Sequence, residues 1–111
     1  MAEAPWTRAG DAALLEAASR VLLRVQGREI AVFKQGEALF AMDDSCPHSG
    51  ASLCVGRIDA GHVRCPAHGL RFRLTDGHIA GSSTEGSAGR MAVRVFPVRV
   101  VTGAIELQLG Q

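Results

Sequence analysis

The sequence contains no tyrosine, only three cysteines and no long apolar run. Three cysteines do not describe a disulfide framework of the kind that staples small secreted domains. A membrane-spanning helix needs about 20 largely apolar residues, and the sequence has no such stretch. Residues 1–6 carry neither a basic start nor an apolar segment, so we expect no secretory signal. These absences predict a cytoplasmic protein without a membrane anchor.

An excess of charge of one sign is also absent. Twelve Lys and Arg residues against 11 Asp and Glu residues leave a formal net charge of +1. No cluster of basic residues is interleaved with aromatic ones, which argues against nucleic-acid binding. We therefore expect the scattered arginines to be solvated strand positions; they are Arg71, Arg73, Arg90, Arg94 and Arg99.

Many short apolar runs separated by glycine turns dominate the chain, and this pattern predicts β-strands. Hairpins are expected around Gln26–Gly27 and Thr102–Gly103, and a short helix within residues 11–19. The last long run, 91–101, predicts one strand that is bulged or at a sheet edge at Pro97. The fold class is therefore all-β, a sandwich or small barrel, with residues 1–111 forming one domain.

Two short segments combine cysteine with histidine: Cys46-Pro-His48 and Cys65-Pro-Ala-His68. Together they read C-x-H-x16-C-x-x-H, with a glycine within two residues of each histidine. Thiolate and imidazole are the side chains that hold soft or borderline metals well. The pattern therefore predicts one metal site with four protein ligands.

Two kinds of metal site fit this ligand set. Two Cys and two His suit a tetrahedral structural zinc. Zinc fingers, however, usually group Cys with Cys and His with His, whereas each segment here is mixed. Mixed segments also allow the two thiolates to bind one metal atom and the two imidazoles another, as in an iron–sulfur cluster with His₂ on one iron.

The two segments with their flanks, 45–51 and 64–69, resemble the Rieske family. This resemblance implies a Rieske-like β-sandwich with an inserted cluster-binding subdomain at about residues 43–79. It also implies one [2Fe-2S] cluster, with Cys46 and Cys65 on one iron and His48 and His68 on the other. These four residues are the expected metal and cofactor ligands, and no catalytic residue is expected.

The resemblance also predicts a low reduction potential. Respiratory Rieske proteins carry an extra Cys in each loop, joined as a disulfide, and the matching positions here are Ala51 and Ala67. High-potential members carry a Ser and a Tyr after the second segment, where this chain has Gly69, Leu70 and Phe72. With fewer hydrogen-bond donors, the potential should lie near the low end of the family range of roughly −150 to +300 mV.

A single-domain chain with these features is similar to the ferredoxin component of bacterial oxygenase systems. The implied function is to pass single electrons from a flavoprotein reductase to a terminal Rieske oxygenase, without being an enzyme itself. The alternative is a small subunit of a larger reductase, similar to that of nitrite reductase. A zinc-stabilised interaction module is a third interpretation.

The residues beside the ligands carry no charge. Together with the near-neutral net charge, they predict that electron delivery depends only weakly on ionic strength. Cys54 is expected to be a small buried hydrophobe, and His62 and His78 are expected to be surface residues at strand ends.

Overall fold

The computed structural model describes residues 5–46, 50–67, 69–80 and 92–109. These residues form three antiparallel sheets, a short α-helix and a 3-10 turn, so the predicted all-β class is confirmed. The first sheet has the order β1-β11-β10, with β1 at Thr7–Asp11, β10 at Val98–Val101 and β11 at Ala104–Leu107. The helix, α1, spans Ala13–Ala18, within the segment where the sequence predicts one.

The second sheet has the order β2-β3-β4-β9 and the third has the order β5-β6-β7-β8. The strands of the second are β2 Arg20–Val25, β3 Arg28–Gln35, β4 Ala38–Asp43 and β9 Val95–Phe96. The strands of the third are β5 Arg57–Asp59, β6 His62–Arg64, β7 Arg71–Arg73 and β8 Ile79–Ala80, preceded by the 3-10 turn η1 at Leu53–Val55.

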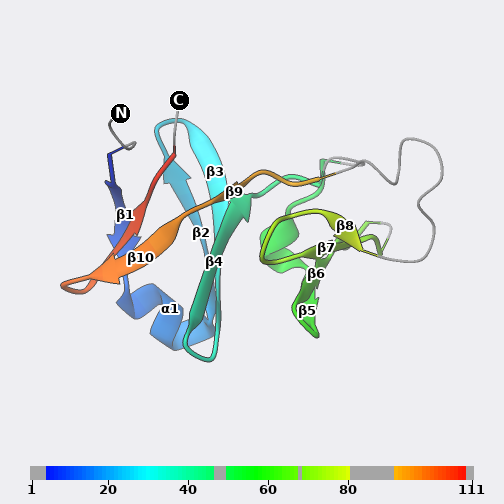
Figure 1. Ribbon diagram of the computed structural model, residues 1–111, viewed down its shortest axis with the longest axis horizontal. Helices are drawn as coiled ribbons and strands as arrows, with labels where there is room; N and C mark the ends of the chain where they lie inside the picture. The colour runs from blue at the N-terminus through cyan, green and yellow to red at the C-terminus, as the bar shows by residue number, and fades with distance from the viewer. Residues whose placement is uncertain (1–4, 47–49, 68, 81–91, 110–111) are drawn as a thin grey trace.

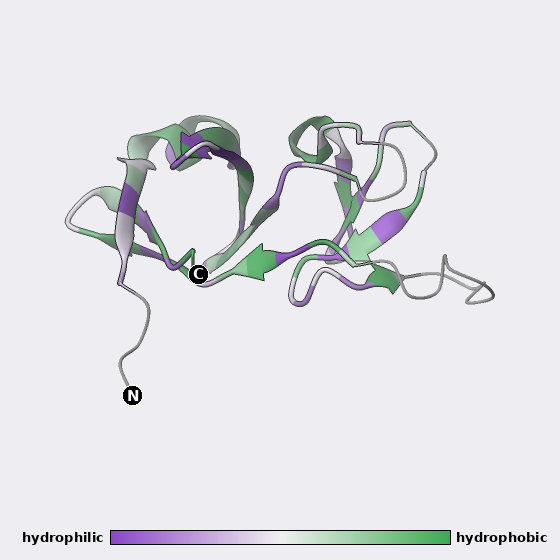
Figure 2. Cartoon of the chain, turned by 90° about the horizontal axis from the view of Figure 1, so that it is seen from above, coloured by the Kyte–Doolittle hydropathy of each residue, from purple (hydrophilic) through white to green (hydrophobic). Residues whose placement is uncertain are grey.

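The first two sheets and α1 form what we call the main lobe, and β5–β8 with η1 form the small lobe (Figure 1). Seen from above, the two lobes again lie side by side (Figure 2).

Strand β3 is buried on both faces. Ile30 and Val32 belong to a buried cluster that includes Ile105 of β11, whereas Phe33 belongs to a second cluster that includes Phe72 of the small lobe. Successive strand residues point to opposite faces, so a single strand contributes to both cores. This explains the continuous burial of residues 30–33 in a sheet that is covered on each side.

Both predicted hairpins are confirmed. Gln26 and Gly27 join β2 to β3 with φ of 53° and 79°, and Thr102 and Gly103 join β10 to β11 with φ of 51° and 78°. Positive φ at both central residues matches the twist of antiparallel strands, and glycine adopts it without steric cost.

The prediction of one closing strand over 91–101 is wrong. The segment contains two strands in different sheets: β9 pairs with β4, and β10 pairs with β11. Pro97 lies between them and has no N–H for a ladder, while its carbonyl accepts a 3.1 Å hydrogen bond from the Gln108 N–H. The break at Pro97 moves the chain from one sheet of the main lobe to the other. No local pattern predicted β1, a strand that is bulged between Arg8 and Gly10.

Within the described residues, no helix is long and apolar enough to cross a membrane.

Candidate metal centre

The first cysteine loop folds back onto Cys46. The Cys46 N–H donates to the Ala51 carbonyl at 2.9 Å, and the Gly50 N–H donates to the Cys46 carbonyl at 2.7 Å. The backbone of the cysteine is therefore held from both sides by residues beyond the turn.

The second cysteine loop repeats this pattern. The Cys65 N–H donates to the Leu70 carbonyl at 2.7 Å, and the Gly69 N–H donates to the Cys65 carbonyl at 2.8 Å. In both loops the partners lie four and five residues after the cysteine, although the histidine follows at a different spacing. The sequence thus encodes two equivalent turns, each of which presents one cysteine.

Each loop needs its glycine because of backbone conformation. Gly50 and Gly69 have φ of 77° and 76°, in the left-handed region that other residues rarely adopt. A Cβ at either position would meet no atom within 4 Å, so space is not the constraint. The two glycines close the turns that hold Cys46 and Cys65.

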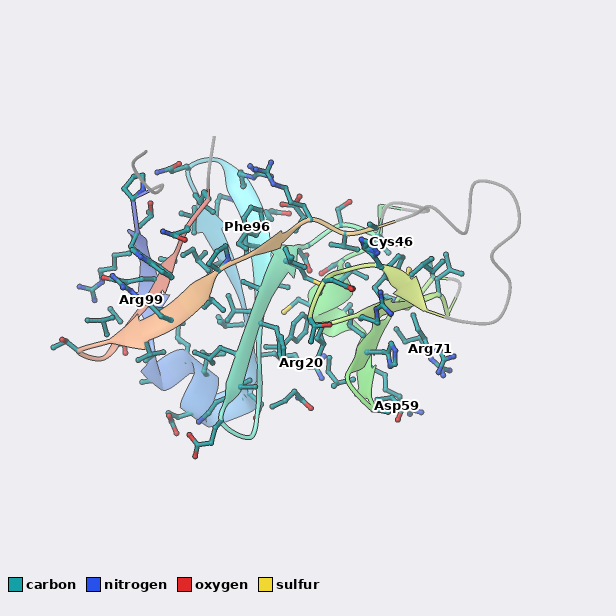
Figure 3. All side chains as sticks on the ribbon, viewed as in Figure 1. Arg20, Cys46, Asp59, Arg71, Phe96 and Arg99 are labelled. Carbon is teal, nitrogen blue, oxygen red and sulfur yellow. The ribbon has the colours of Figure 1, made fainter. Side chains whose placement is uncertain are left out.

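The two cysteines are buried beneath exposed loop residues. Cys46 and Cys65 are each 1% exposed, and both belong to the buried cluster that contains Phe33 and Phe72. The loop residues around them are exposed at positions 50, 66, 67 and 69. The thiols therefore lie close to solvent but within an apolar surrounding, and Figure 3 shows Cys46 in the upper part of the small lobe.

A buried carboxylate fixes the segment that follows the first loop. Asp44 is 6% exposed, and its Oδ2 accepts a hydrogen bond from the Ser52 hydroxyl at 2.6 Å. Its Oδ1 accepts one from the Cys54 N–H, also at 2.6 Å. Asp44 lies two residues before Cys46, so it joins the start of the loop to η1.

An arginine of the main lobe holds the other end of η1. Arg20 of β2 donates through one guanidinium nitrogen to the carbonyls of Cys54, at 2.9 Å, and Gly56. Its guanidinium also lies 5.8 Å from the centre of the Phe33 ring. Burial raises the pKa of the Cys54 thiol, the Asp44 carboxylate adds to the rise, and Arg20 partly offsets it.

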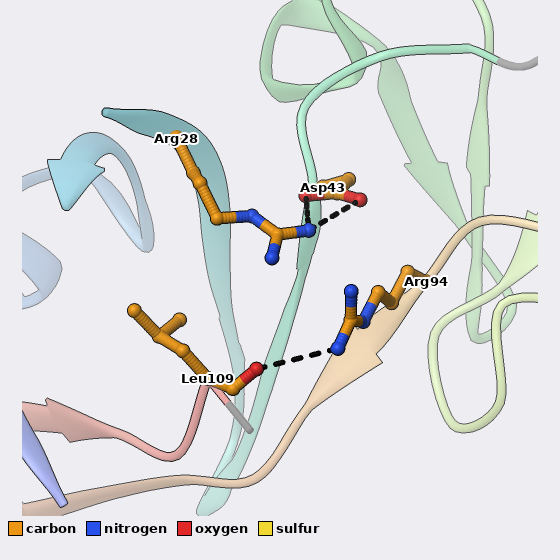
Figure 4. A network of polar contacts seen from close by, with 4 residues as sticks. All are labelled: Arg28, Asp43, Arg94 and Leu109. Atoms are coloured by element: carbon orange, nitrogen blue, oxygen red, sulfur yellow. Dashed lines mark hydrogen bonds and ion pairs between the residues drawn. The ribbon is translucent and has the colours of Figure 1, made fainter. Parts of the chain in front are cut away.

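A second polar network lies where the chain passes between the lobes (Figure 4). Arg28 contacts both carboxylate oxygens of Asp43 at 3.3 Å, and Arg94 donates to the Leu109 carbonyl at 3.3 Å. The two guanidinium groups lie 5.1 and 5.3 Å from the centre of the Phe96 ring. This network fixes the chain as it leaves β4 toward the first loop and as it returns to β9.

The sequence profile of the Rieske [2Fe-2S] domain matches residues 5–97, which is most of the chain. The chain belongs to the Rieske [2Fe-2S] family. Its cofactor is therefore a [2Fe-2S] cluster, and its chemistry is the transfer of single electrons.

The relatives of this Rieske domain include both ferredoxins and oxygenase subunits. It is 42% identical over 89 residues to the anthranilate 1,2-dioxygenase ferredoxin subunit of Burkholderia cepacia, with 78% of this chain and 77% of that protein covered. It is 32% identical to the 3-chlorobenzoate-3,4-dioxygenase oxygenase subunit of Comamonas testosteroni, with 95% of this chain but only 26% of that protein covered.

Solved structures show the same fold. A complex of reduced oxygenase and oxidised ferredoxin in carbazole 1,9a-dioxygenase matches with a TM-score of 0.74 and 28% identity, covering 93% of this chain and 92% of the matched chain. The Sphingomonas yanoikuyae B1 ferredoxin matches with a TM-score of 0.76 and 20% identity, covering 96% and 100% of the two chains. The expected Rieske-like β-fold is therefore confirmed.

The described residues fit a two-iron cluster. Cys46 and Cys65 lie in equivalent turns beside one apolar cluster. Soft thiolates in such a surrounding suit iron and sulfide. The predicted ligands His48 and His68 lie outside the described residues, and among the residues that the structure does describe no group of three or more metal-binding side chains converges.

The remaining sequence expectations have mixed outcomes. Cys54 is buried, at 8% exposure, as expected for a small hydrophobe. His78 is exposed beside β8, whereas His62, which begins β6, is half-buried with its Nδ1 unpartnered among the described atoms. Of the arginines expected to be solvated, Arg73, Arg94 and Arg99 are exposed and Arg71 is half-buried, whereas Arg90 lies outside the described residues. Arg73 and Arg99 also form ion pairs, with Asp76 and Glu106.

Sequence reasoning missed Asp44 and Arg20. Asp44 follows another aspartate, a context that indicates a solvated turn rather than a buried acceptor. Arg20 looks like an ordinary strand residue, and its role depends on η1 lying more than 30 positions away. Only the folded arrangement identifies either residue as a support of the site.

Proposed function

We propose that this Rieske domain is the ferredoxin component of a multicomponent oxygenase system. In that role it accepts single electrons from a flavoprotein reductase and delivers them to a terminal Rieske oxygenase. It is a carrier rather than an enzyme, and it acts in the cytoplasm. The observation that carries this proposal is the 42% identity to a dioxygenase ferredoxin subunit over most of both chains.

We further propose which residues bind the irons of the cluster. Cys46 and Cys65 bind one iron of the cluster as thiolates, and His48 and His68 bind the other. The two equivalent turns closed by Gly50 and Gly69 support this assignment, because they present two cysteines in equivalent backbone conformations. The cluster-binding unit is proposed to span about residues 43–79, which include η1 and strands β5–β7.

The residues of this chain have defined tasks in such a carrier. The two glycine turns keep the backbone of Cys46 and Cys65 fixed while the charge of the site changes. Asp44 and Arg20 anchor η1 to the loop and to the main lobe. A rigid surrounding is required because rapid electron transfer depends on little rearrangement between the two redox states.

The test begins with metal analysis of the purified protein. We expect two irons and two labile sulfides per chain, a red-brown colour, and a Rieske-type EPR signal after reduction. Stoichiometric zinc without sulfide would contradict the proposal. Cys65→Ala or His48→Ala should lose the cluster, whereas Cys54→Ala should keep it.

A reconstitution experiment tests the role in the oxygenase system. A flavoprotein reductase and a terminal oxygenase should turn over substrate only when this protein is added. Its omission, or its replacement by the Cys65→Ala variant, should abolish turnover. Unchanged turnover without it would show that the cluster serves another partner.

A further inference from the structure

Three arginines lie side by side on neighbouring strands of the small lobe. In the register of the sheet, Arg57 of β5 faces Arg64 of β6, and Arg64 faces Arg71 of β7. Residues directly opposite each other in a sheet share one face, with their Cβ atoms about 5 Å apart. The three side chains therefore form a row of about 10 Å across the sheet, which we call the arginine row.

The arginine row is on the outer face of this sheet. The alternate residues, Val63 and Phe72, are fully buried in the core shared with the main lobe. Arg57 and Arg64 are exposed, and Arg71 is half-buried. Figure 3 shows Arg71 on the side of the small lobe that points away from the main lobe.

None of the ion pairs among the described residues includes a member of the arginine row. Arg73, farther along β7, is instead paired with Asp76 at 2.8 Å. Like charges placed opposite each other in a sheet are destabilising. The arginine row therefore costs folding free energy. A partner molecule that pairs with these charges is the simplest reason for the chain to carry them.

The arginine row continues into the second cysteine loop. Arg64 immediately precedes Cys65, and both line a surface hollow with Arg57, Val55 and Pro66. Val55 is 72% exposed, more than any other large hydrophobic residue among those described. An apolar contact and three cations thus lie together beside one of the proposed cluster ligands.

We propose that the arginine row, with Val55, is the docking surface for a carboxylate-bearing surface of a redox-partner protein. This proposal rests on the proposed function as an electron carrier. Three arginines that have no ion-pair partner among the described residues complement carboxylates, and the exposed valine suits the small apolar centre of a transient interface. The partner would then lie against the Cys65 loop.

The arginine row changes an expectation drawn from the sequence. Uncharged residues beside the ligands and a near-zero net charge predict weak dependence on ionic strength. Strand register instead concentrates three positive charges within about one Debye length of each other. Local charge of this kind steers association even when the whole molecule is nearly neutral.

The first test measures electron transfer to an acidic blue-copper protein as a surrogate partner. One electron leaves the reduced cluster and converts Cu(II) to Cu(I), which stopped-flow absorbance follows directly. We expect the second-order rate constant to fall about tenfold or more as ionic strength rises. The triple variant Arg57→Gln/Arg64→Gln/Arg71→Gln should be slow at low salt and almost insensitive to salt.

A matched variant removes the same formal charge from the main lobe: Arg8→Gln/Arg24→Gln/Arg99→Gln. It should keep most of the low-salt rate and of the salt dependence. Equal losses in the two triple variants would overturn the proposal, because they would show that only net charge matters. A wild-type rate that does not fall with salt would also overturn it.

The second test needs no electron transfer. Binding of the oxidised protein to the same immobilised acidic protein, measured by surface plasmon resonance, should weaken at least about tenfold in the arginine-row variant. The Val55→Ser variant should weaken binding without changing its salt dependence. Absence of iron and sulfide from the wild-type protein would refute the carrier function, whereas an intact cluster with unchanged binding in the arginine-row variant would refute the docking surface alone.

Discussion

The buried carboxylate of Asp44 accepts a 2.6 Å hydrogen bond from the backbone N–H of Cys54, ten residues farther along the chain. The same carboxylate accepts the Ser52 hydroxyl at 2.6 Å. The two bonds join the start of the first cysteine loop to η1. Because η1 is also held by Arg20 of the main lobe, this carboxylate connects the loop to the rest of the fold.

Asp44→Ala should therefore be strongly destabilising. It leaves a buried N–H and a hydroxyl without their acceptor, which costs roughly 2–3 kcal/mol for bonds to a charged group. Urea unfolding of the iron-loaded protein, followed by circular dichroism, measures this loss. The neighbouring Asp43→Ala is the control, because the Asp43–Arg28 pair is longer and partly exposed. It should cost less than about 1 kcal/mol, and equal losses would show that burial of Asp44 is unimportant.

Cys54 should make stability depend on alkaline pH. Burial raises the pKa of its thiol, Asp44 adds to the rise, and Arg20 offsets part of it. The folded state thus holds the thiol proton more tightly than the unfolded state does. The resulting stabilisation is complete below the unfolded pKa of about 8.5 and is lost as pH rises through the folded pKa.

The Cys54→Ala variant lacks this titration and tests its sign. The free energy of unfolding of the wild type should fall more steeply than that of the variant as pH rises above about 8.5. The variant should retain the iron, the sulfide and the visible spectrum. Parallel pH profiles would contradict the raised pKa, and loss of iron would make Cys54 a ligand.

Local signals in the sequence predicted much of the fold. Gln26–Gly27 and Thr102–Gly103 specify hairpins because a glycine with positive φ suits such turns. The glycines after His48 and His68 likewise indicated the two turns that place Cys46 and Cys65. These features depend on a few neighbouring residues, so a single sequence reveals them.

Features that depend on pairing between distant segments were not predictable. Pro97 indicated a disturbed strand, but only the packing of the two sheets shows that it separates strands of different sheets. Arg57, Arg64 and Arg71 look scattered along the chain, and strand register brings them together. Asp44 gave no sign of burial, because its partners lie on a separate turn.

Gly77→Ala should destabilise the protein at the point where the chain returns from the small lobe. Gly77 has φ of 76°, and an added Cβ would overlap the carbonyl oxygen of Val93. Backbone strain costs about 1–2 kcal/mol, and the overlap adds a further 1–3 kcal/mol or so. Gly103→Ala is a matched control, because Gly103 has φ of 78° and no atom within 4 Å of the added Cβ. Urea unfolding should separate the two variants by at least about 1 kcal/mol, and equal effects would show that the Val93 segment gives way freely.

The midpoint potential should be negative at pH 7 and should change little around that pH. The chain has no tyrosine, and Leu70 and Phe72, which follow the second loop, carry no side-chain donor. The Leu70 carbonyl accepts the Cys65 N–H at 2.7 Å, which fixes this residue opposite a proposed ligand.

A hydroxyl introduced by Leu70→Ser can donate a hydrogen bond toward the sulfur atoms and so stabilise the more negative, reduced state. One bond of about 1 kcal/mol corresponds to about 45 mV for a one-electron couple, so the potential should rise by several tens of millivolts. Protein-film voltammetry measures this shift, with Leu22→Ser of the exposed β2 surface as the control that should not move it. A wild-type midpoint of roughly +250 mV or above, in the respiratory part of the family range, would refute the low-potential assignment.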